Sequence, residues 1–243
     1  MYRVWQTRLL SASAVRDAGG RVLHSVSIEL DITERKRAEE RIRKLNRVYA
    51  MLSNINQAIV RIREPQALFE EACRVAVEEG GFRMAWIGLA DSTSKKVLPA
   101  AQAGVTDGYL EKLDIVLGDD ARGRGPAGSA VRTGKHMVCN DIENDPSMAP
   151  WREDALCNGY RSSAAFPLKV SGECRGTFGL YAAEPGFFDD EETKLLDELA
   201  MDIGFAMEFA EKEAERKRAE EALRESETRY RMLFEDARDG MTL

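Results

Sequence analysis

The chain has 243 residues with 35 basic and 42 acidic side chains, which gives a net charge of −7 and a pI near 5.2. This acidic balance argues against nucleic-acid binding, because affinity for phosphate backbones comes largely from basic charge. Four cysteines without a Cys-x-x-Cys pair are too few for a disulfide framework or a zinc ribbon and favour a reducing cytoplasm. No apolar run approaches roughly 18 residues, so we expect no direct membrane contact.

Residues 1–33 predict a β-hairpin. Strand-like runs span Trp5–Val15 and Val22–Ile32, and Asp17–Gly20 has the composition of a turn. An isolated hairpin is only marginally stable, so we interpret this segment as the last two strands of a domain.

Two charged segments of the chain are copies of one another. The run Glu34–Glu40 recurs letter for letter as Glu215–Glu221, 181 residues later. This period is too long for a solenoid repeat. We therefore interpret residues 34–64 and 208–226 as helical connectors, or signalling helices, on either side of one central domain.

The first connector carries an apolar stripe with alternating spacings of three and four residues. Its members are Leu45, Val48, Leu52, Ile55, Ile59 and Ile62. This spacing is typical of a coiled-coil seam, and about three heptads are marginal as an isolated helix. We expect the stripe to pack in a parallel homodimer; the alternative is that it covers the chain's own core.

The central segment, residues 65–207, alternates strands with short helices. Pro65 suits the first turn of a helix that stops at Gly80-Gly81. Strands are expected at Met84–Ala90, Lys96–Ala103, His136–Asn140, Ser162–Val170 and Arg175–Ala183, and helices at Asp107–Leu113, Ala127–Arg132, Pro150–Asn158 and from Asp190 onward. The turn at residues 170–174 makes the last two strands a hairpin. An α+β fold with an antiparallel sheet is therefore favoured over a doubly wound parallel sheet.

Three segments resemble known signalling domains. The run Asp31-Ile-Thr-Glu-Arg-Lys-Arg-Ala-Glu-Glu40 is similar to the C-terminal end of a PAS domain, and Glu227–Met241, within residues 227–243, resembles the start of another. Between them, residues 65–207 resemble a GAF domain, the small-molecule-sensing module often found between PAS domains in bacterial histidine kinases and cyclic-di-GMP enzymes. The resemblance implies long first and last helices on one sheet face and pocket-closing loops with short helices on the other.

A glycine-rich loop, Gly123-Arg-Gly-Pro-Ala-Gly128, has the spacing of a dinucleotide-binding fingerprint, with an acid, Asp141, 18 residues after its first glycine. Asp119 and Asp120 would place negative charge beside a pyrophosphate, and the following helix is short. We interpret the loop as the cap of a short helix.

Catalytic signatures are missing from the sequence. There is no Walker phosphate loop, no cyclase Gly-Gly-Asp/Glu-Glu-Phe run and no histidine in the context of a kinase phospho-acceptor. Cys139, Cys157 and Cys174 leave a thiol-based redox enzyme or sensor as a minor alternative, although their spacing differs from that of GAF proteins that reduce free methionine sulfoxide. The acidic run Asp189–Glu192 is interpreted as a helix start and not as a metal site.

The resemblance supplies no cofactor, because the Asn-Lys pair of cyclic-nucleotide-binding GAF domains and the Cys-His pair of tetrapyrrole attachment are both absent. The residues expected to line a ligand pocket are Trp86, Tyr109, Trp151, Tyr160, Ser163, Ala165 and Tyr181, with Asp141 as a polar contact. Any of the aromatic residues could instead be core. The sequence thus predicts a non-enzymatic sensory module that binds an unknown small ligand and acts through paired helices on neighbouring PAS and output domains. The alternative is a ligand-free dimerising spacer.

Overall fold

The structure, a computed structural model, describes residues 8–105 and 108–240. Trp5 and Asp107, where a strand and a helix were expected to begin, lie outside the described residues. The chain divides into two compact units, Met1–Arg47 and Val48–Leu243, and each is described by itself. Within the described ranges, no helix has both the length and the apolar composition required to cross a membrane.

The first unit contains the predicted hairpin. Strands β1 (Arg8–Arg16) and β2 (Val22–Asp31) pair antiparallel, with Arg8 opposite Asp31. The Asp17 carboxylate organises the turn by accepting hydrogen bonds from the backbone N–H groups of Gly19 and Arg21, both at 2.9 Å. Gly20 has φ +84°, a conformation that glycine adopts without the steric cost of a Cβ.

The helix α1 (Thr33–Arg61) contains the first connector copy and most of the apolar stripe. The structure corrects the expected use of that stripe. Val48, Leu52 and Ile55 are buried in the chain's own core, and Ile59 packs against them. Leu45 and Ile62 are half-buried. The alternative reading therefore describes these side chains better than a dimer seam does, because the sheet and the last helix supply enough apolar surface to cover them within one chain.

The second unit is built on one six-stranded antiparallel sheet with the strand order β5-β4-β3-β8-β7-β6. The strands are β3 (Met84–Asp91), β4 (Lys96–Gly104), β5 (Ile115–Val116), β6 (Met137–Cys139), β7 (Ser162–Val170) and β8 (Glu173–Ala182). This arrangement confirms the predicted α+β class, and the short strands β5 and β6 are the two edges.

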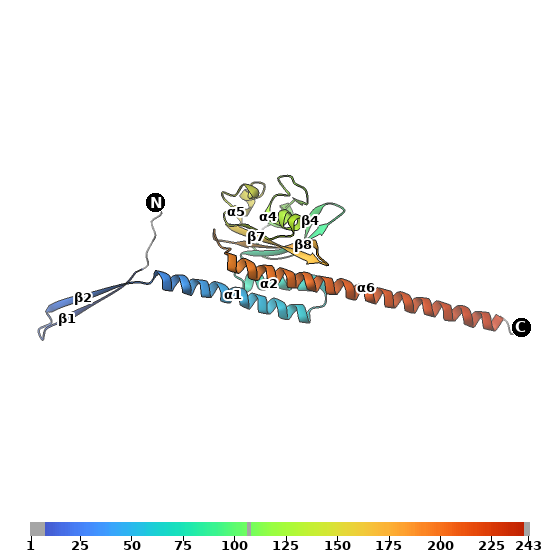
Figure 1. The fold of residues 1–243 in the computed structure, drawn as a ribbon, viewed down its shortest axis with the longest axis horizontal. Coiled ribbons are helices and arrows are strands. Elements are labelled where there is room, and N and C mark those ends of the chain that lie inside the picture. The colour runs from blue at the N-terminus through green and yellow to red at the C-terminus, as the bar shows by residue number, and fades with distance from the viewer. Residues whose placement is uncertain (1–7, 106–107, 241–243) are drawn as a thin grey trace. The chain divides into compact units, whose positions relative to one another are not determined.

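Helices cover both faces of this sheet (Figure 1). They are α2 (Pro65–Glu78), α3 (Tyr109–Lys112), α4 (Pro126–Thr133), the 3-10 turn η1 (Pro146–Met148), α5 (Arg152–Cys157) and α6 (Asp190–Gly240), in addition to the second half of α1. The second half of α1, together with α2 and α6, lies on one face, and α4 and α5 lie on the other.

The connector at residues 208–226 and the PAS-like segment that follows it were interpreted as separate parts, but α6 continues without a break from Asp190 to Gly240. No glycine or proline interrupts residues 205–239. Ion pairs one turn apart along the exposed helix add support, including Lys212 with Glu208 at 2.6 Å and Arg216 with Glu213 at 2.7 Å. The second connector copy is thus part of the same helix that packs on the sheet.

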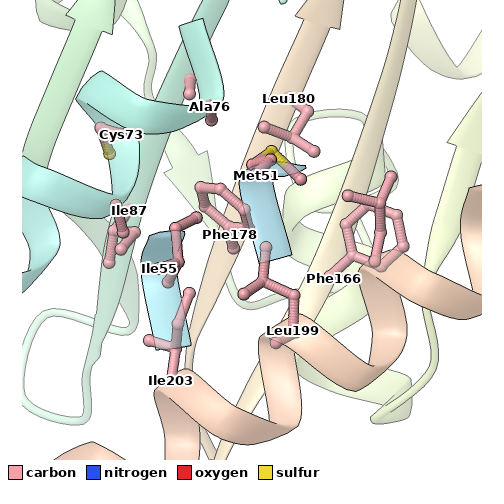
Figure 2. Close-up of a cluster of buried hydrophobic side chains, with 14 of the residues drawn as sticks. Met51, Ile55, Cys73, Ala76, Ile87, Phe166, Phe178, Leu180, Leu199 and Ile203 are labelled. Atoms are coloured by element: carbon pink, nitrogen blue, oxygen red, sulfur yellow. The ribbon is translucent and has the colours of Figure 1, made fainter. Parts of the chain in front are cut away.

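The core has two layers, separated by the sheet. We call the layer under the long helices the helix layer; in Figure 2, Ile55 of α1, Phe178 of β8 and Ile203 of α6 meet in it, and all three are fully buried. Residues on the opposite face of the same strands form a second cluster, because successive side chains of a strand point to opposite faces. Burial on both faces fixes the register of the central strands.

The indole of Trp86 on β3 lies against the backbone of the neighbouring strand β8. A Cβ added to Gly179 would lie 2.1 Å from Trp86 Nε1, and one added to Gly88 would lie 2.5 Å from Trp86 Cζ3. The two glycines therefore make the space that the buried indole fills.

We expect Gly179→Ala to lower the free energy of unfolding by about 1–3 kcal/mol, because the new methyl group overpacks a site that the rigid indole cannot leave. Urea denaturation measures this change. Gly118→Ala is the matched control, since the nearest atom to its Cβ would be 3.8 Å away. Equal stability of the two variants would contradict this account of Trp86.

Candidate functional site

The second apolar cluster lies on the sheet face opposite α1, α2 and α6, and we call it the cavity layer. It consists of Met84, Trp86, Val97, Tyr109, Leu110, Ile115, Ala127, Ala130, Val131, Cys139, Ile142, Met148, Trp151, Ala155, Tyr160, Ala165 and Tyr181. The strands β3, β7 and β8 form its floor, and α3, α4, η1 and α5 cover it.

The structure brings most of the predicted pocket residues into this layer. Six of the eight, namely Trp86, Tyr109, Trp151, Tyr160, Ala165 and Tyr181, belong to the cluster. Ser163 pairs with Tyr181 across β7 and β8, which places the two side chains on the same face of the sheet. The buried Ser163 hydroxyl has no hydrogen-bond partner among the described residues.

Asp141 does not join the cavity layer. Its side chain is exposed, and its carboxylate accepts hydrogen bonds from the backbone N–H of Asn144 at 3.2 Å and from the Asn144 amide group at 2.8 Å. The carboxylate closes a local turn, as aspartates often do. The expected polar contact of Asp141 with a ligand is therefore corrected to a structural role.

Three tyrosines form the centre of the cavity layer. The ring centroids of Tyr109, Tyr160 and Tyr181 lie 4.7–5.6 Å apart, and the hydroxyls of Tyr109 and Tyr181 are 3.3 Å apart. Tyr160 donates its hydroxyl hydrogen to the carbonyl of Val105. Burial raises the pKa of Tyr181 to about 12 and that of Tyr109 well above its usual value. These hydroxyls are therefore neutral hydrogen-bonding groups at physiological pH and not bases.

A small cavity opens beside this cluster. It is lined by Leu113, Ile115, Gly125, Pro126, Ala127, Gly128, Met148, Trp151 and Tyr181. Its volume is about 10 Å³, which is room for about one water molecule. Its lining carries no charged side chain, so the cavity suits a neutral group better than an ion.

Trp151 closes this cavity against the glycine-rich loop. A Cβ on Gly125 would lie 2.3 Å from the Trp151 ring, so only glycine lets the indole approach this closely. The indole is 8% exposed. Arg152 braces the segment by donating to the carbonyls of Ile142 at 3.2 Å and Asp145 at 2.8 Å. We call residues 141–161 the covering segment.

The backbone of the glycine-rich loop packs closely on itself. A Cβ on Gly123 would lie 1.9 Å from the carbonyl oxygen of Gly118, and one on Gly128 would lie 2.6 Å from that of Gly123. Arg132 donates to both carbonyls, at 2.9 and 2.8 Å. The glycines thus serve the packing of the loop on itself, as the cap of a short helix requires.

Met148 and Ile142 cover the cavity layer, although neither was predicted. Both are fully buried. The Asp145 carboxylate accepts a hydrogen bond from the Ser147 N–H at 2.8 Å and so starts the turn η1 that carries Met148. The Asp-Pro dipeptide at 145–146 signals such a turn, but an isolated methionine has no periodic pattern from which its burial can be predicted.

The acidic run before α6 acts as a helix start. The Asp189 carboxylate accepts hydrogen bonds from the N–H groups of Glu191 at 3.1 Å and Glu192 at 2.9 Å. Such capping satisfies backbone donors that have no partner within the helix. Among the described side chains, no group of three or more potential ligands is placed to hold a metal ion.

All four cysteines have free thiols. Burial raises the pKa of Cys139 and of Cys73 to about 12, and it also raises that of Cys174. Cys157 is exposed. Since the thiolate is the reactive species, the two buried thiols are poor nucleophiles at neutral pH.

We expect iodoacetamide at pH 8 to alkylate Cys157 rapidly in the folded protein and to leave Cys139 and Cys73 unmodified, because burial keeps these two protonated and covered. Peptide mass spectrometry reports the modification of each site, and the urea-unfolded chain, in which all four react, is the control. Labelling of Cys139 as fast as Cys157 would contradict the buried, protonated state.

Comparisons with known proteins agree with this architecture. The chain is 29% identical over 233 residues to a methyl sulfide methyltransferase-associated sensor of Methanosarcina acetivorans; the match covers 93% of this chain and 21% of that protein. The chain thus spans about a fifth of the length of this relative.

Solved structures share the fold. A free methionine-R-sulfoxide reductase from Neisseria meningitidis, bound to its substrate, is 22% identical with a TM-score of 0.57, over 69% of this chain and 91% of that one. The GAF domain of a phosphoenolpyruvate-protein phosphotransferase from Coxiella burnetii is 16% identical with a TM-score of 0.57, over 69% and 96%. The GAF domain family model matches residues 63–208, which is more than half of the sequence. The chain therefore belongs to the GAF domain family.

Proposed function

We propose that this chain is a regulatory sensory module that binds a small molecule in the cavity layer and passes the change to neighbouring domains through α1 and α6. The observation that carries the proposal is the small apolar cavity lined by Trp151 and Tyr181, on the sheet face opposite the long helices. The similarity to a sensor and the GAF family membership support the same role.

The chemistry of the cavity limits the ligand. Charged ligands are disfavoured because no charged side chain lines the cavity, and an unpaired buried charge is costly. A polar contact is nevertheless offered by the hydroxyl of Tyr181, which lines the cavity and can donate a hydrogen bond. A ligand larger than one water molecule must displace Trp151. We therefore propose a small, uncharged ligand with a hydrogen-bond acceptor.

A ligand-free spacer is the competing function. The small volume of the cavity favours it, because the aromatic residues already fill most of the space that a pocket would need. Thiol chemistry is the minor alternative suggested by the reductases that share the fold. The raised pKa of Cys139 argues against that alternative.

A thermal-shift screen against uncharged metabolites separates the sensor from the spacer, because a ligand of the native state must raise the melting temperature. We expect at least one compound to stabilise the wild type, and we expect Trp151→Ala to lose most of that shift. Tyr49→Ala is the control, since Tyr49 is 56% exposed on α1. A stabilising compound whose effect survives Trp151→Ala would place the site elsewhere, and a screen with no hits would favour the spacer.

The long helices offer a surface for a second copy of the chain. Val60 on α1 and Met201, Phe205 and Phe209 on α6 are between 50% and 70% exposed. The last turn of α1, the start of α2 and α6 also line a groove of about 990 Å³. Its lining includes Arg63, Glu64, Glu211, Glu213 and Lys217, so both signs of charge are present. Such a mixed, apolar surface can be self-complementary across a two-fold axis.

We propose that the homodimer forms through this face and not through the buried stripe of α1. The double variant Phe205→Glu/Phe209→Glu is expected to be monomeric, because it places four charges in the centre of a two-fold interface. Analytical ultracentrifugation over a range of concentrations measures the association. Leu98→Glu on β4, where Leu98 is 48% exposed, is the control. A wild type that stays monomeric at high concentration would overturn the dimer.

The flanking segments are proposed to belong to PAS domains of a longer, cytoplasmic signalling protein such as a histidine kinase or a cyclic-di-GMP enzyme. The sensor relative aligns with 93% of the chain, so the match extends beyond residues 63–208 into the connectors. The identical runs at 34–40 and 215–221 support a connector that is used twice between domains.

A further inference from the structure

The edge strand β6 is placed where the two core layers can be joined. The sheet separates the cavity layer from the helix layer across its central strands, so side chains of the two layers cannot meet there. At the edge formed by β6, the chain can pass around the sheet. The residues that flank this three-residue strand, His136 and Asn140, contact α6 and the segment just before it.

Asn140 is bound to this segment by three hydrogen bonds. Its side-chain amide donates to the carbonyl of Phe188 at 2.8 Å, and its side-chain oxygen accepts from the Phe188 N–H at 3.0 Å. Its backbone carbonyl accepts from the Gly186 N–H at 2.7 Å. The side chain therefore pairs with Phe188 as a neighbouring strand would, and few substitutions can reproduce both bonds.

Phe188 and the residue after it determine where α6 begins. The Phe188 ring is 4% exposed and stacks on Phe82 with a centroid distance of 5.9 Å in the helix layer. Asp189 then caps the first turn of α6. A displacement of Asn140 must consequently move the start of α6 or break these hydrogen bonds.

The covering segment begins at the residue that follows Asn140. The carbonyl of Asp141 accepts the Asp145 N–H at 2.9 Å, and the Ile142 N–H donates to the carbonyl of Arg161 at 2.9 Å. Ile142 and Trp151 are both part of the cavity layer. A ligand that displaces Trp151 therefore pulls on a braced segment whose first residue is covalently joined to Asn140.

A second connection lies at the other end of β6. His136 Nδ1 is 2.7 Å from the Asp197 carboxylate, two turns into α6. The helix α6 also packs on the sheet through apolar residues of the helix layer, and polar contacts hold it beside the β7–β8 turn. The Ser171 N–H donates to Glu208 at 2.9 Å, and Gly204 packs on the backbone of Lys169. These contacts hold α6 to the sheet without involving the covering segment.

We propose that Asn140 is the positioning residue that couples the cavity layer to the first two turns of α6. The inference rests on the proposed function for its physiological meaning, since it describes how a sensed change would leave the cavity layer. The coupling itself is a property of the folded chain and can be measured without a ligand.

A double-mutant cycle read by native-state hydrogen exchange tests this coupling. Trp151→Ala loosens the covering segment. In the wild-type background, we expect it to accelerate exchange of the amides of residues 190–197 by at least about fivefold, the lower end of usual coupling between sites. In the Asn140→Ala background, Trp151→Ala should still accelerate exchange in residues 141–161. The exchange rates of residues 190–197 in the double variant should, however, stay within about twofold of those in Asn140→Ala alone.

If Asn140 only stabilises the fold, Asn140→Ala changes the exchange rates, but Trp151→Ala still accelerates exchange of residues 190–197 in that background. Asn144→Ala is the matched control, because the side chain of Asn144 makes a local hydrogen bond to Asp141 and no bond to α6 among the described residues. If Asn140→Ala does not fold, the isosteric Asn140→Asp keeps the acceptor for the Phe188 N–H and removes the donor, and the same loss is expected. Equal effects of Trp151→Ala on residues 190–197 in the wild-type and Asn140 backgrounds, or no effect in the wild type, would overturn the proposal. A failed ligand screen would leave this result unaffected and would count against the proposed function alone.

Discussion

Burial of one sheet on both of its faces is the constraint on which the rest of the structure depends. On β8, Phe178 and Leu180 enter the helix layer, and Tyr181 enters the cavity layer. A shift of one residue in the register of β8 would exchange the two sets of side chains. Burial on both faces therefore holds the strand in a single register. Close packing against glycine backbones, as under Trp86, leaves little space between the layers and the sheet. A change in the cavity layer must therefore be accommodated at the edges of the sheet.

The helix α6 is the element through which a change at the sheet edge would reach a neighbouring domain. Its first turns are held by β6, its middle carries Ile203 in the core, and its exposed continuation contains the second connector copy. One continuous helix thus joins core packing to the segment that we propose leads to the next domain, and a rotation at its start needs no hinge to reach its end. The exposed Phe205 and Phe209 lie between these two regions, where a dimer partner would sense the same rotation.

Sequence patterns predicted the sheet, the hairpin and most of the cavity layer, because these depend on local periodicity and on aromatic residues that are rarely exposed. The stripe on α1 was read as a dimer seam, since periodicity shows that a helix face is apolar but not which surface covers it. The carboxylate of Asp141 was expected to face the pocket, but a local turn binds it. The role of Asn140 could not be predicted, because its partner Phe188 is 48 residues away and is contacted through its backbone, which carries no sequence signal.

We propose above all that this GAF domain senses its signal in the cavity layer. The most direct test is a crystal structure of the chain with a compound that stabilises it. The account predicts the compound between the α4 loop and Trp151, with the indole displaced and the Asn140–Phe188 pair shifted together with the start of α6. A compound bound in the groove between α1, α2 and α6, with the cavity layer unchanged, would contradict it.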